Sequence, residues 1–400
     1  MNIPKIEILS LIFSYILVNM FFGGVNMKKI TVCLLTFLML PTFAFAQPEL
    51  GISAKSAILM ELSTGQVMYE QNADEPLPIA SVTKIMTMLL ACEAIDSGKI
   101  KLDDGVVVSE RAMSMGGSTM FLETGDVVSV DEIMKGIAVA SANDGAVAIA
   151  EHIAGSEMEF VRLMNERAKE LGMINSAFVN TNGLDADGHY SSARDVAIMS
   201  RELLKHKLIF NYTKIWTDTI RNGRFELANT NKLIRFYKGA NGLKTGSTSL
   251  AKCCLSASAE RDGMQLIAVV LGAPDSNARF NGAKAMLDYG FSAYSVREIV
   301  PSGTELARVK VSGGLSKDAG CEIKKTESVL LDKSDSSEFE YTVEPLPELT
   351  APIYKGDEVG EVVITKNGEE FKRIPAYANG EVGKKTFFLS FLEVLRCLYS

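Results

Sequence analysis

Histidine and cysteine are scarce in this sequence, and the few that occur are not spaced as metal ligands. The three histidines, His152, His189 and His206, lie far apart and form no H-E-x-x-H motif. The six cysteines contain no C-x-x-C pair. Zinc sites need ligands at short, regular spacings, and disulfide scaffolds need a higher cysteine density. The sequence therefore predicts neither a zinc site nor a disulfide framework.

An excess of positive charge is also lacking. Lys and Arg total 41 against 49 Asp and Glu, which gives a net charge of −8. Nucleic acid is not an expected partner, because its phosphates demand a basic surface. Hydrophobic residues make up 47% and charged residues 22%, which is typical of a globular chain and excludes a disordered one. The 400 residues allow two to three domains.

The beginning of the chain contains two apolar runs. Residues 27–46 have the pattern of a signal peptide, with two lysines, an apolar run and Ala44-Phe45-Ala46 before the expected cleavage site. Removing it leaves five of the six cysteines, so at least one thiol stays unpaired. Residues 1–26 contain a further apolar run that is long enough to be a membrane-span candidate. We prefer a start of synthesis at Met27; the alternative is an uncleaved membrane helix.

The other end of the chain predicts an amphipathic helix over residues 384–400. Lys384 and Lys385 precede aromatic residues and leucines, with polar residues gathered along one stripe of the helix. This pattern is typical of a helix that lies in a membrane interface. The alternative is a terminal helix packed on its own domain. We expect a peripheral attachment to the outer face of the cytoplasmic membrane.

Between the ends, the sequence predicts two domains. Over residues 47–295, strand-like and helix-like segments alternate, which indicates an α/β or α+β layered domain. Residues 296–383 alternate apolar and polar side chains at period two, and Asn367-Gly368 is a strong signal for a hairpin turn. This second segment predicts a small all-β domain. The sequence of the first domain predicts a hairpin over 56–69 and a buried strand over 266–272. The predicted helices are 81–96, 129–139 (which a capping box of Ser129 and Glu132 opens), 144–154, 157–171, 194–204 and 276–289.

The start of the first long helix carries Ser81-Val82-Thr83-Lys84. A spacing of three on a helix places the hydroxyl and the amine on one face, where the amine could take the proton of the hydroxyl. The motif alone is weak, because simple N-capping by Ser81 explains it equally well. A second copy, Ser249 to Lys252, falls in a strand-like run that would send the two side chains to opposite faces. Ser249 is therefore a poor candidate for a nucleophile.

Two further short motifs follow. Ser141-Ala142-Asn143 lies between two predicted helices, where its hydroxyl and carboxamide could point into a cleft or could simply cap a helix. Lys244-Thr245-Gly246 enters a predicted strand and offers an ammonium, a hydroxyl and a glycine that allows a ligand close to the backbone. Each triplet alone is commonplace. Their combination and order are far more specific.

S-x-x-K, S-x-N and K-T-G in this order resemble the penicillin-recognising serine transferases. The sequence is most similar to the low-molecular-mass penicillin-binding proteins, the D-alanyl-D-alanine carboxypeptidases of peptidase family S11, in their sporulation-associated Gram-positive branch. Segments 78–87, 188–195 and 245–248 resemble that family as well. Lys252-Cys253-Cys254 departs from the pattern, which puts details of the substrate in doubt. The resemblance implies a penicillin-binding-protein fold with an all-β domain and a C-terminal amphipathic helix.

The resemblance also implies the roles of the site residues. Ser81 is the expected nucleophile, Lys84 the general base, and Ser141 with Lys244 a proton relay to the leaving D-alanine. Asn143 would hold the substrate's amide, and Lys244 with Thr245 its carboxylate, beside Gly246. The backbone N–H groups of Ser81 and Ser247 would stabilise the oxyanion. The expected partners are a peptidoglycan stem peptide ending in D-Ala-D-Ala and β-lactams as covalent inhibitors, without metal or cofactor.

Three other functions are compatible with part of this pattern. A class A β-lactamase normally adds a Glu-x-x-x-Asn pattern for deacylation, and none occurs from Asp144 to Asn241. Transpeptidation by the same acyl-enzyme is a secondary possibility, since an amine can replace water. A penicillin sensor or peptidoglycan-binding protein without turnover is the non-enzymatic alternative, which the three intact motifs disfavour. His152 is expected to be structural, and His189 to support the cleft without being catalytic.

Overall fold

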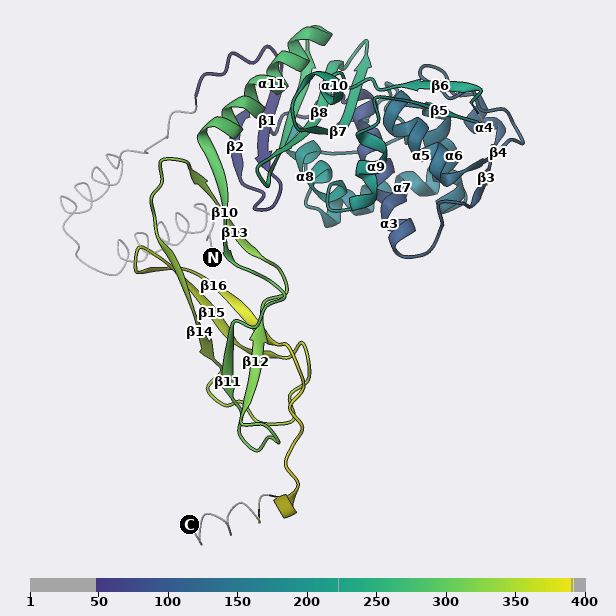
Figure 1. The fold of residues 1–400 in the computed structure, drawn as a ribbon. Helices are drawn as coiled ribbons and strands as arrows, with labels where there is room; N and C mark the ends of the chain where they lie inside the picture. Colours follow the sequence, from purple (N-terminus) through teal and green to yellow (C-terminus); the bar gives the residue numbers. More distant parts are fainter. Residues whose placement is uncertain (1–47, 222, 390, 392–400) are drawn as a thin grey trace, which may run out of the picture. The chain divides into compact units, whose positions relative to one another are not determined.

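The computed structural model describes residues 48–221, 223–389 and 391 (Figure 1). Its first region is built on an antiparallel sheet of five strands in the order β2-β1-β9-β8-β7. The strands are β1 Ser56–Glu61, β2 Val67–Gln71, β7 Ala240–Thr248, β8 Lys252–Arg261 and β9 Met264–Ala273. All six residues of β1 are buried, because apolar clusters cover both faces of the sheet.

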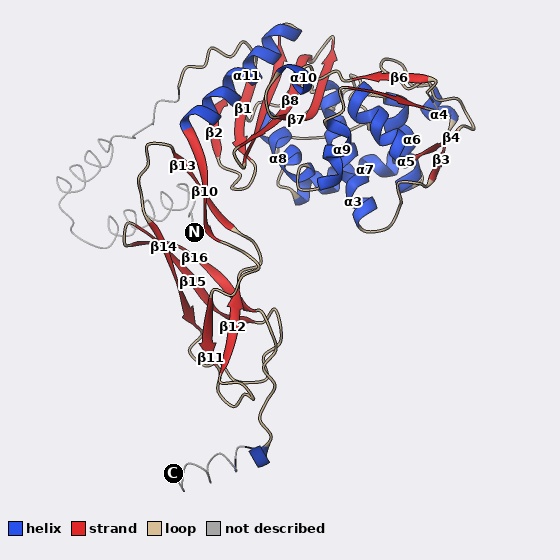
Figure 2. Ribbon diagram, in the orientation of Figure 1, coloured by secondary structure: helices blue, strands red, loops and turns tan. Residues whose placement is uncertain are grey.

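Helices of the first region pack on both faces of this sheet (Figure 2). α11 (Ser276–Ala293) packs on one face of the sheet, against β9 and β8. The other helices and short strands belong to the larger helical part. They are η1 Ala80–Thr83, α3 Lys84–Asp96, β3 Gly105–Val107, α4 Glu110–Met113, β4 Val127–Ser129, α5 Val130–Lys135, η2 Gly136–Ala140, α6 Asn143–Ala154, α7 Glu157–Glu170, α8 Ala193–Leu203, η3 Lys207–Ile209, α9 Phe210–Thr213, β5 Thr217–Ile220, β6 Phe225–Ala228 and α10 Leu233–Phe236.

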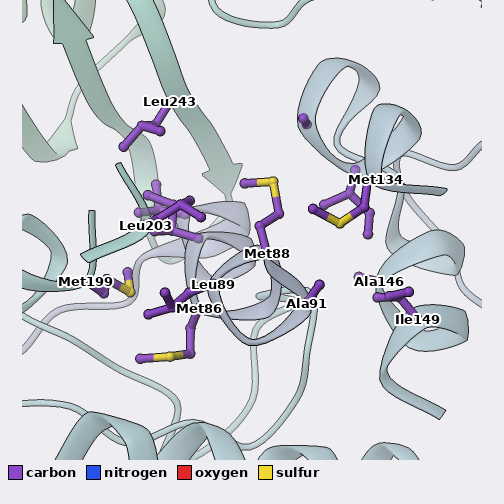
Figure 3. Close-up of a cluster of buried hydrophobic side chains, with 14 of the residues drawn as sticks. Met86, Met88, Leu89, Ala91, Met134, Ala146, Ile149, Met199, Leu203 and Leu243 are labelled. Atoms are coloured by element: carbon purple, nitrogen blue, oxygen red, sulfur yellow. The ribbon is translucent and has the colours of Figure 1, made fainter. Parts of the chain in front are cut away.

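The helix α3 is buried on nearly all sides. Met86, Met88 and Leu89 are fully buried among side chains from α5, α6, α8 and β7 (Figure 3). A helix that is apolar all round belongs in the middle of a core, because no face of it is suited to water. The N-terminal end of α3 is thereby held in place, and this end carries the S-x-x-K motif.

Most elements predicted for the first region are confirmed. The hairpin of β1 and β2, the buried strand β9 and the closing helix α11 are present. The Ser129 hydroxyl accepts a hydrogen bond from the Glu132 amide at 3.2 Å and caps α5, as the sequence predicted. The helix continues as the π-helical turn η2, which ends just before Ser141.

The position predicted for the second S-x-x-K motif is wrong. Ser249 lies in the turn between β7 and β8, because the two strands form a tight hairpin that reverses there and restarts at Lys252, with φ at 57°. Its hydroxyl donates to the carboxylate of Asp185 at 3.4 Å. Among the described side chains, Ser249 and Lys252 share no hydrogen bond, so the conclusion that Ser249 is a poor nucleophile stands.

The second region is all-β, as predicted. Its main sheet has the order β11-β12-β16-β15-β14, and β10 pairs with β13. Asn367 and Gly368 have φ angles of 52° and 83°, which are the positive values that a type I′ turn requires. The strands are β10 Tyr294–Val300, β11 Ala307–Lys310, β12 Asp318–Glu322, β13 Glu327–Asp332, β14 Phe339–Pro345, β15 Glu358–Lys366 and β16 Glu369–Ala378.

The predictions for the two ends of the chain are not tested by this structure. The signal peptide and the upstream apolar run lie outside the described residues, as does most of the predicted helix 384–400. Within the part of the chain that is described, no helix has the length and apolarity needed to cross a membrane. The four described cysteines, Cys92, Cys253, Cys254 and Cys321, are free thiols.

Candidate active site

Ser81 and Lys84 meet at the beginning of α3. Ser81 belongs to the short helix η1, which leads directly into α3, and the Lys84 amine lies 3.0 Å from the Ser81 hydroxyl oxygen. The spacing of three residues brings both side chains to the same face of the helix, as the sequence predicted. The Ser81 side chain is half-buried, whereas Lys84 is fully buried. The hydroxyl is thus reachable and its partner amine is shielded.

The Lys84 amine is surrounded by neutral acceptors. It donates to the Ser81 hydroxyl, to the side-chain oxygen of Asn143 at 2.6 Å and to the backbone carbonyl of Asn182 at 2.6 Å. Burial, with a further contribution from the positive charge of Lys244, holds the pKa of Lys84 well below its usual range, while Asp144 acts in the opposite direction. The lowered pKa favours the neutral amine, which is the form that can accept a proton.

The S-x-N motif lies on an irregular link between η2 and α6. Ser141 has a left-handed backbone, with φ at 66°, and its side chain is buried. Asn143 uses both ends of its amide within the chain, since its oxygen accepts from Lys84 and its nitrogen donates to Gly116 O at 2.7 Å. Among the described side chains, Ser141 has no hydrogen bond to Ser81 or Lys84. The structure thus joins Asn143 directly to the pair and leaves Ser141 next to it along the chain.

Asp144 fixes the loop that runs past this link. Its carboxylate accepts hydrogen bonds from the backbone amides of Met120 and Leu122 at 3.0 to 3.1 Å. The backbone N–H of Asn143 donates to the Ser118 carbonyl in the same loop, at 2.7 Å. Sequence reasoning assigned no role to Asp144, and its place directly after the S-x-N motif was the available signal.

The K-T-G motif lies on β7, beside the beginning of α3. The Lys244 ammonium is buried and donates to the Thr245 carbonyl at 3.0 Å. Burial, followed by the positive charge of Arg279, lowers the pKa of Lys244 from 10.5 to about 7. The Thr245 hydroxyl donates to the Thr230 hydroxyl at 2.7 Å. This strand therefore adds a second lysine whose charge changes near neutral pH.

Gly246 is needed for the close approach of β7 to Ser81. A Cβ atom at this position would lie 2.8 Å from Ile79 O and 2.9 Å from the Ser81 backbone nitrogen. A side chain would therefore push the strand away from the nucleophile. Ser247, the next residue, is exposed. The expected oxyanion donors, Ser81 and Ser247, thus lie on two elements that pack against each other at Gly246.

Several residues of the site were missed from the sequence. Asn182 supplies a carbonyl to Lys84, Thr230 binds Thr245, and the buried Arg279 donates to Gly246 O at 3.0 Å. For Asn182 a signal existed, because it belongs to an Asn-Gly turn just before the segment 188–195. Arg279 lies on α11 without a local sequence signal. No group of three or more His, Cys, Asp and Glu side chains within the described ranges is arranged to hold a metal ion.

Comparison with known proteins decides the family. A profile described as D-alanyl-D-alanine carboxypeptidase, of peptidase family S11, matches residues 42–275, and one described as the C-terminal domain of penicillin-binding protein 5 matches 294–384. The chain is 45% identical to the D-alanyl-D-alanine carboxypeptidase DacF of Bacillus subtilis, over 92% of this chain and 97% of that protein. The chain belongs to the peptidase S11 family of D-alanyl-D-alanine carboxypeptidases. The family expected from the three motifs is confirmed.

Further relatives and solved structures support this membership. DacC of Escherichia coli is 36% identical over 88% of this chain and 90% of that protein. The crystal structure of penicillin-binding protein 5 from Haemophilus influenzae matches with a TM-score of 0.71 and 30% identity, covering 83% of this chain and 98% of that one. The penicillin-binding-protein fold, with a catalytic domain followed by an all-β domain, is thus confirmed.

A second solved structure holds a β-lactam. Penicillin-binding protein D2 from Listeria monocytogenes, in its ampicillin-bound form, matches with a TM-score of 0.56 and 32% identity. The match covers 61% of this chain and all of that one. The solved structures that are similar to this chain therefore include a penicillin-binding protein with bound ampicillin.

Proposed function

We propose that this protein is a serine-type D-Ala-D-Ala carboxypeptidase that removes the terminal D-alanine from peptidoglycan stem pentapeptides. Its removal would limit cross-linking in the cell wall or the spore cortex, because the terminal D-Ala-D-Ala bond is the one that acyl transfer consumes. The observation that carries the proposal is the 3.0 Å contact between the Ser81 hydroxyl and a Lys84 amine that is fully buried among neutral acceptors.

The first half of the reaction forms an acyl-enzyme. The Ser81 oxygen attacks the carbonyl carbon between the two D-alanines, while neutral Lys84 accepts the hydroxyl proton. The new C–O bond converts the carbonyl into an oxyanion, which the backbone N–H groups of Ser81 and Ser247 stabilise. The C–N bond then breaks. The nitrogen of the leaving D-alanine takes the proton that Lys84 accepted, relayed through Ser141 and Lys244, and Lys84 is neutral again.

The second half returns the free enzyme. Water attacks the ester carbonyl and gives a proton to Lys84. The ester C–O bond to Ser81 then breaks, the Ser81 oxygen takes this proton back from Lys84, and a peptide that is one D-alanine shorter is released. Asn143 is proposed to orient the substrate amide, and Lys244 with Thr245 its terminal carboxylate. Because the Asn143 amide already binds Lys84 and Gly116, the substrate would share this group with the protein.

β-Lactams are proposed to acylate the same serine. Their strained amide resembles the acyl-D-Ala-D-Ala group, and relatives solved with ampicillin and cefotaxime support this proposal. A penicillin sensor without turnover would be labelled as well. Labelling alone therefore does not separate the enzyme from the sensor.

Release of free D-alanine from diacetyl-L-lysyl-D-alanyl-D-alanine tests the function directly. The mature protein should release D-alanine, and Ser81→Ala should abolish both the release and the covalent labelling by a fluorescent penicillin. Ser249→Ala is the matched control, since it changes the serine of the second S-x-x-K motif, and it should keep both. Labelling without release in the wild type would favour the sensor, and release by Ser81→Ala would contradict the assigned nucleophile.

We also propose that the protein is exported and attached to the outer face of the cytoplasmic membrane through residues 384–400. The support is the signal-peptide pattern and the amphipathic pattern of the sequence. Fractionation of a chain truncated after Gly383 tests the attachment. The truncated chain should move to the soluble extracytoplasmic fraction, and a chain that stays on the membrane after signal cleavage would contradict the anchor. A role in sporulation remains a prediction of the resemblance.

A further inference from the structure

A buried histidine is connected through Thr83 to the Ala80 carbonyl, which belongs to the same peptide group as the Ser81 N–H. His189 and Thr83 are both buried, and the His189 Nε2 atom lies 2.7 Å from the Thr83 hydroxyl oxygen. The Thr83 hydroxyl donates to the Ala80 carbonyl at 2.8 Å, and the Val179 amide donates to His189 Nδ1 at 3.1 Å. The Phe178 ring packs edge-on against the imidazole, with 5.9 Å between ring centroids.

These contacts fix the direction of every proton in the chain of hydrogen bonds. His189 Nδ1 accepts from a backbone N–H, so a neutral imidazole must carry its proton on Nε2. Nε2–H therefore donates to Thr83, and the Thr83 hydroxyl is left to donate to Ala80 O. Burial lowers the pKa of His189 to about 4, which keeps the ring neutral under ordinary conditions. The histidine is thus a fixed donor in this arrangement.

Ala80, whose carbonyl accepts the last of these hydrogen bonds, has an unusual backbone conformation. Ala80 has a positive φ of 49°, which a residue with a side chain rarely adopts without support. Gly183 supports it from the same loop as His189, since a Cβ at Gly183 would overlap the Ala80 carbonyl oxygen. The loop 183–189 therefore holds the Ala80 carbonyl both by the hydrogen-bond chain and by close packing.

The direction of the Ala80 carbonyl decides the direction of the Ser81 N–H. In a trans peptide the C=O and the N–H of the same unit point in opposite directions. With Ala80 O held toward Thr83 and Gly183, the Ser81 N–H is aimed away from them. The Ser81 nitrogen lies beside β7, where a Cβ at Gly246 would come within 2.9 Å of it.

We propose that His189 is a positioning residue that acts through Thr83 and the Ala80 carbonyl to aim the Ser81 N–H at the oxyanion. His189 does not touch substrate in this scheme. The inference rests on the proposed function, because it explains how the Ser81 N–H, one donor of the proposed oxyanion site, is held in place. Preorganised donors are effective because they need no reorientation as the charge develops.

The rate of acylation by a fluorescent penicillin tests the proposal. His189→Leu removes the donor at similar size and should slow acylation by about tenfold to a hundredfold, less than the loss seen when an oxyanion donor is removed outright. His189→Gln can donate and accept as the imidazole does, and it should recover most of the rate. In D-alanine release, His189→Leu should lower kcat with little change in KM. His152→Leu is the matched control and should acylate like the wild type.

The threonine provides a second, independent pair of variants. Thr83→Val removes the hydroxyl and should be slow, whereas Thr83→Ser keeps it and should be fast. The double variant Thr83→Val with His189→Leu should be no slower than either single one, because both break the same chain. If His189→Leu does not fold, as judged by thermal unfolding, the Thr83 pair decides.

Opposite results would overturn the proposal. A folded His189→Leu protein that acylates within twofold of the wild type would do so, as would a His189→Gln protein as slow as His189→Leu. Equal rates for Thr83→Val and Thr83→Ser would also contradict it. A wild type that is labelled by penicillin yet releases no D-alanine overturns the proposed turnover alone, since the acylation rates still test His189. A wild type that is not labelled at all overturns both.

Discussion

The two regions of this protein differ in what they bury. The first region encloses many polar and charged side chains between Ser56 and Arg279, including both site lysines. In the β-rich region, as far as the structure describes it, every buried side chain is apolar or a cysteine. Burying a polar group is unfavourable unless it is hydrogen-bonded, so a region that does it repeatedly must supply partners. The difference shows that the core of the first region holds the polar groups that a reaction can use, whereas the core of the second region contributes apolar packing.

The largest effect is expected when the buried base of the first region, Lys84, is replaced. Lys84→Arg keeps a positive charge but cannot be deprotonated, so acylation should fall by about 10²- to 10⁴-fold. The measurement is the rate of labelling by a fluorescent penicillin. Lys252→Arg, at the exposed lysine of the second S-x-x-K motif, is the matched control and should keep the wild-type rate. A Lys84→Arg protein that labels at the wild-type rate would remove Lys84 from the mechanism.

Two substitutions that each create a cavity, one in each core, should both lower stability, but only the one in the first region should lower activity. Leu89 on α3 and Ile364 on β15 are both fully buried, and truncation of either to alanine should destabilise its own region by about 2–5 kcal/mol. Leu89→Ala should also slow acylation, because α3 carries the nucleophile, whereas Ile364→Ala should not. Urea unfolding and penicillin labelling under native conditions measure the two effects. Equal slowing by both variants would show that the regions are not independent.

The buried charge of Lys244 should make stability depend on pH. Its pKa falls from 10.5 to about 7 on folding, so between these values the unfolded chain binds more protons and stability rises with pH. The penalty of the buried ammonium is therefore greatest below pH 7 and is lost toward 10.5. Lys244→Met should raise the Tm over the wild type most below pH 7, and this difference should shrink as the pH rises. A Tm difference that does not vary with pH would contradict a buried charge.

The smallest effect is expected from the surface charges of the second region. Arg373 on β16 pairs with Glu344, Glu361 and Glu370 at 2.6 to 3.2 Å, all largely exposed. Exposed ion pairs contribute little, because water screens them and the side chains must be ordered. Arg373→Ala should leave both the urea midpoint and the acylation rate unchanged. A lowered midpoint would show that this region also depends on its charges.

Much of the fold was predictable because its signals are local. The hairpin of β1 and β2, the Ser129 cap, the Asn367-Gly368 turn and the closing helix α11 each depend on a few adjacent residues. Ser249 was misplaced for the converse reason. Its turn is defined by the pairing of β7 with β8, and no strong turn residue marks it.

The sequence by itself determined the three motifs, their order and the pairing of Ser81 with Lys84, since helix geometry alone brings residues three apart together. The tertiary structure decided what makes this pair reactive. Lys84 meets Asn143 and Asn182 across 59 and 98 residues, and Thr83 meets His189 across 106. The lowered pKa of Lys84 arises from burial and from Lys244, and both are products of packing. A short motif cannot encode these properties, because they depend on the dielectric surroundings and charges that only the assembled core provides.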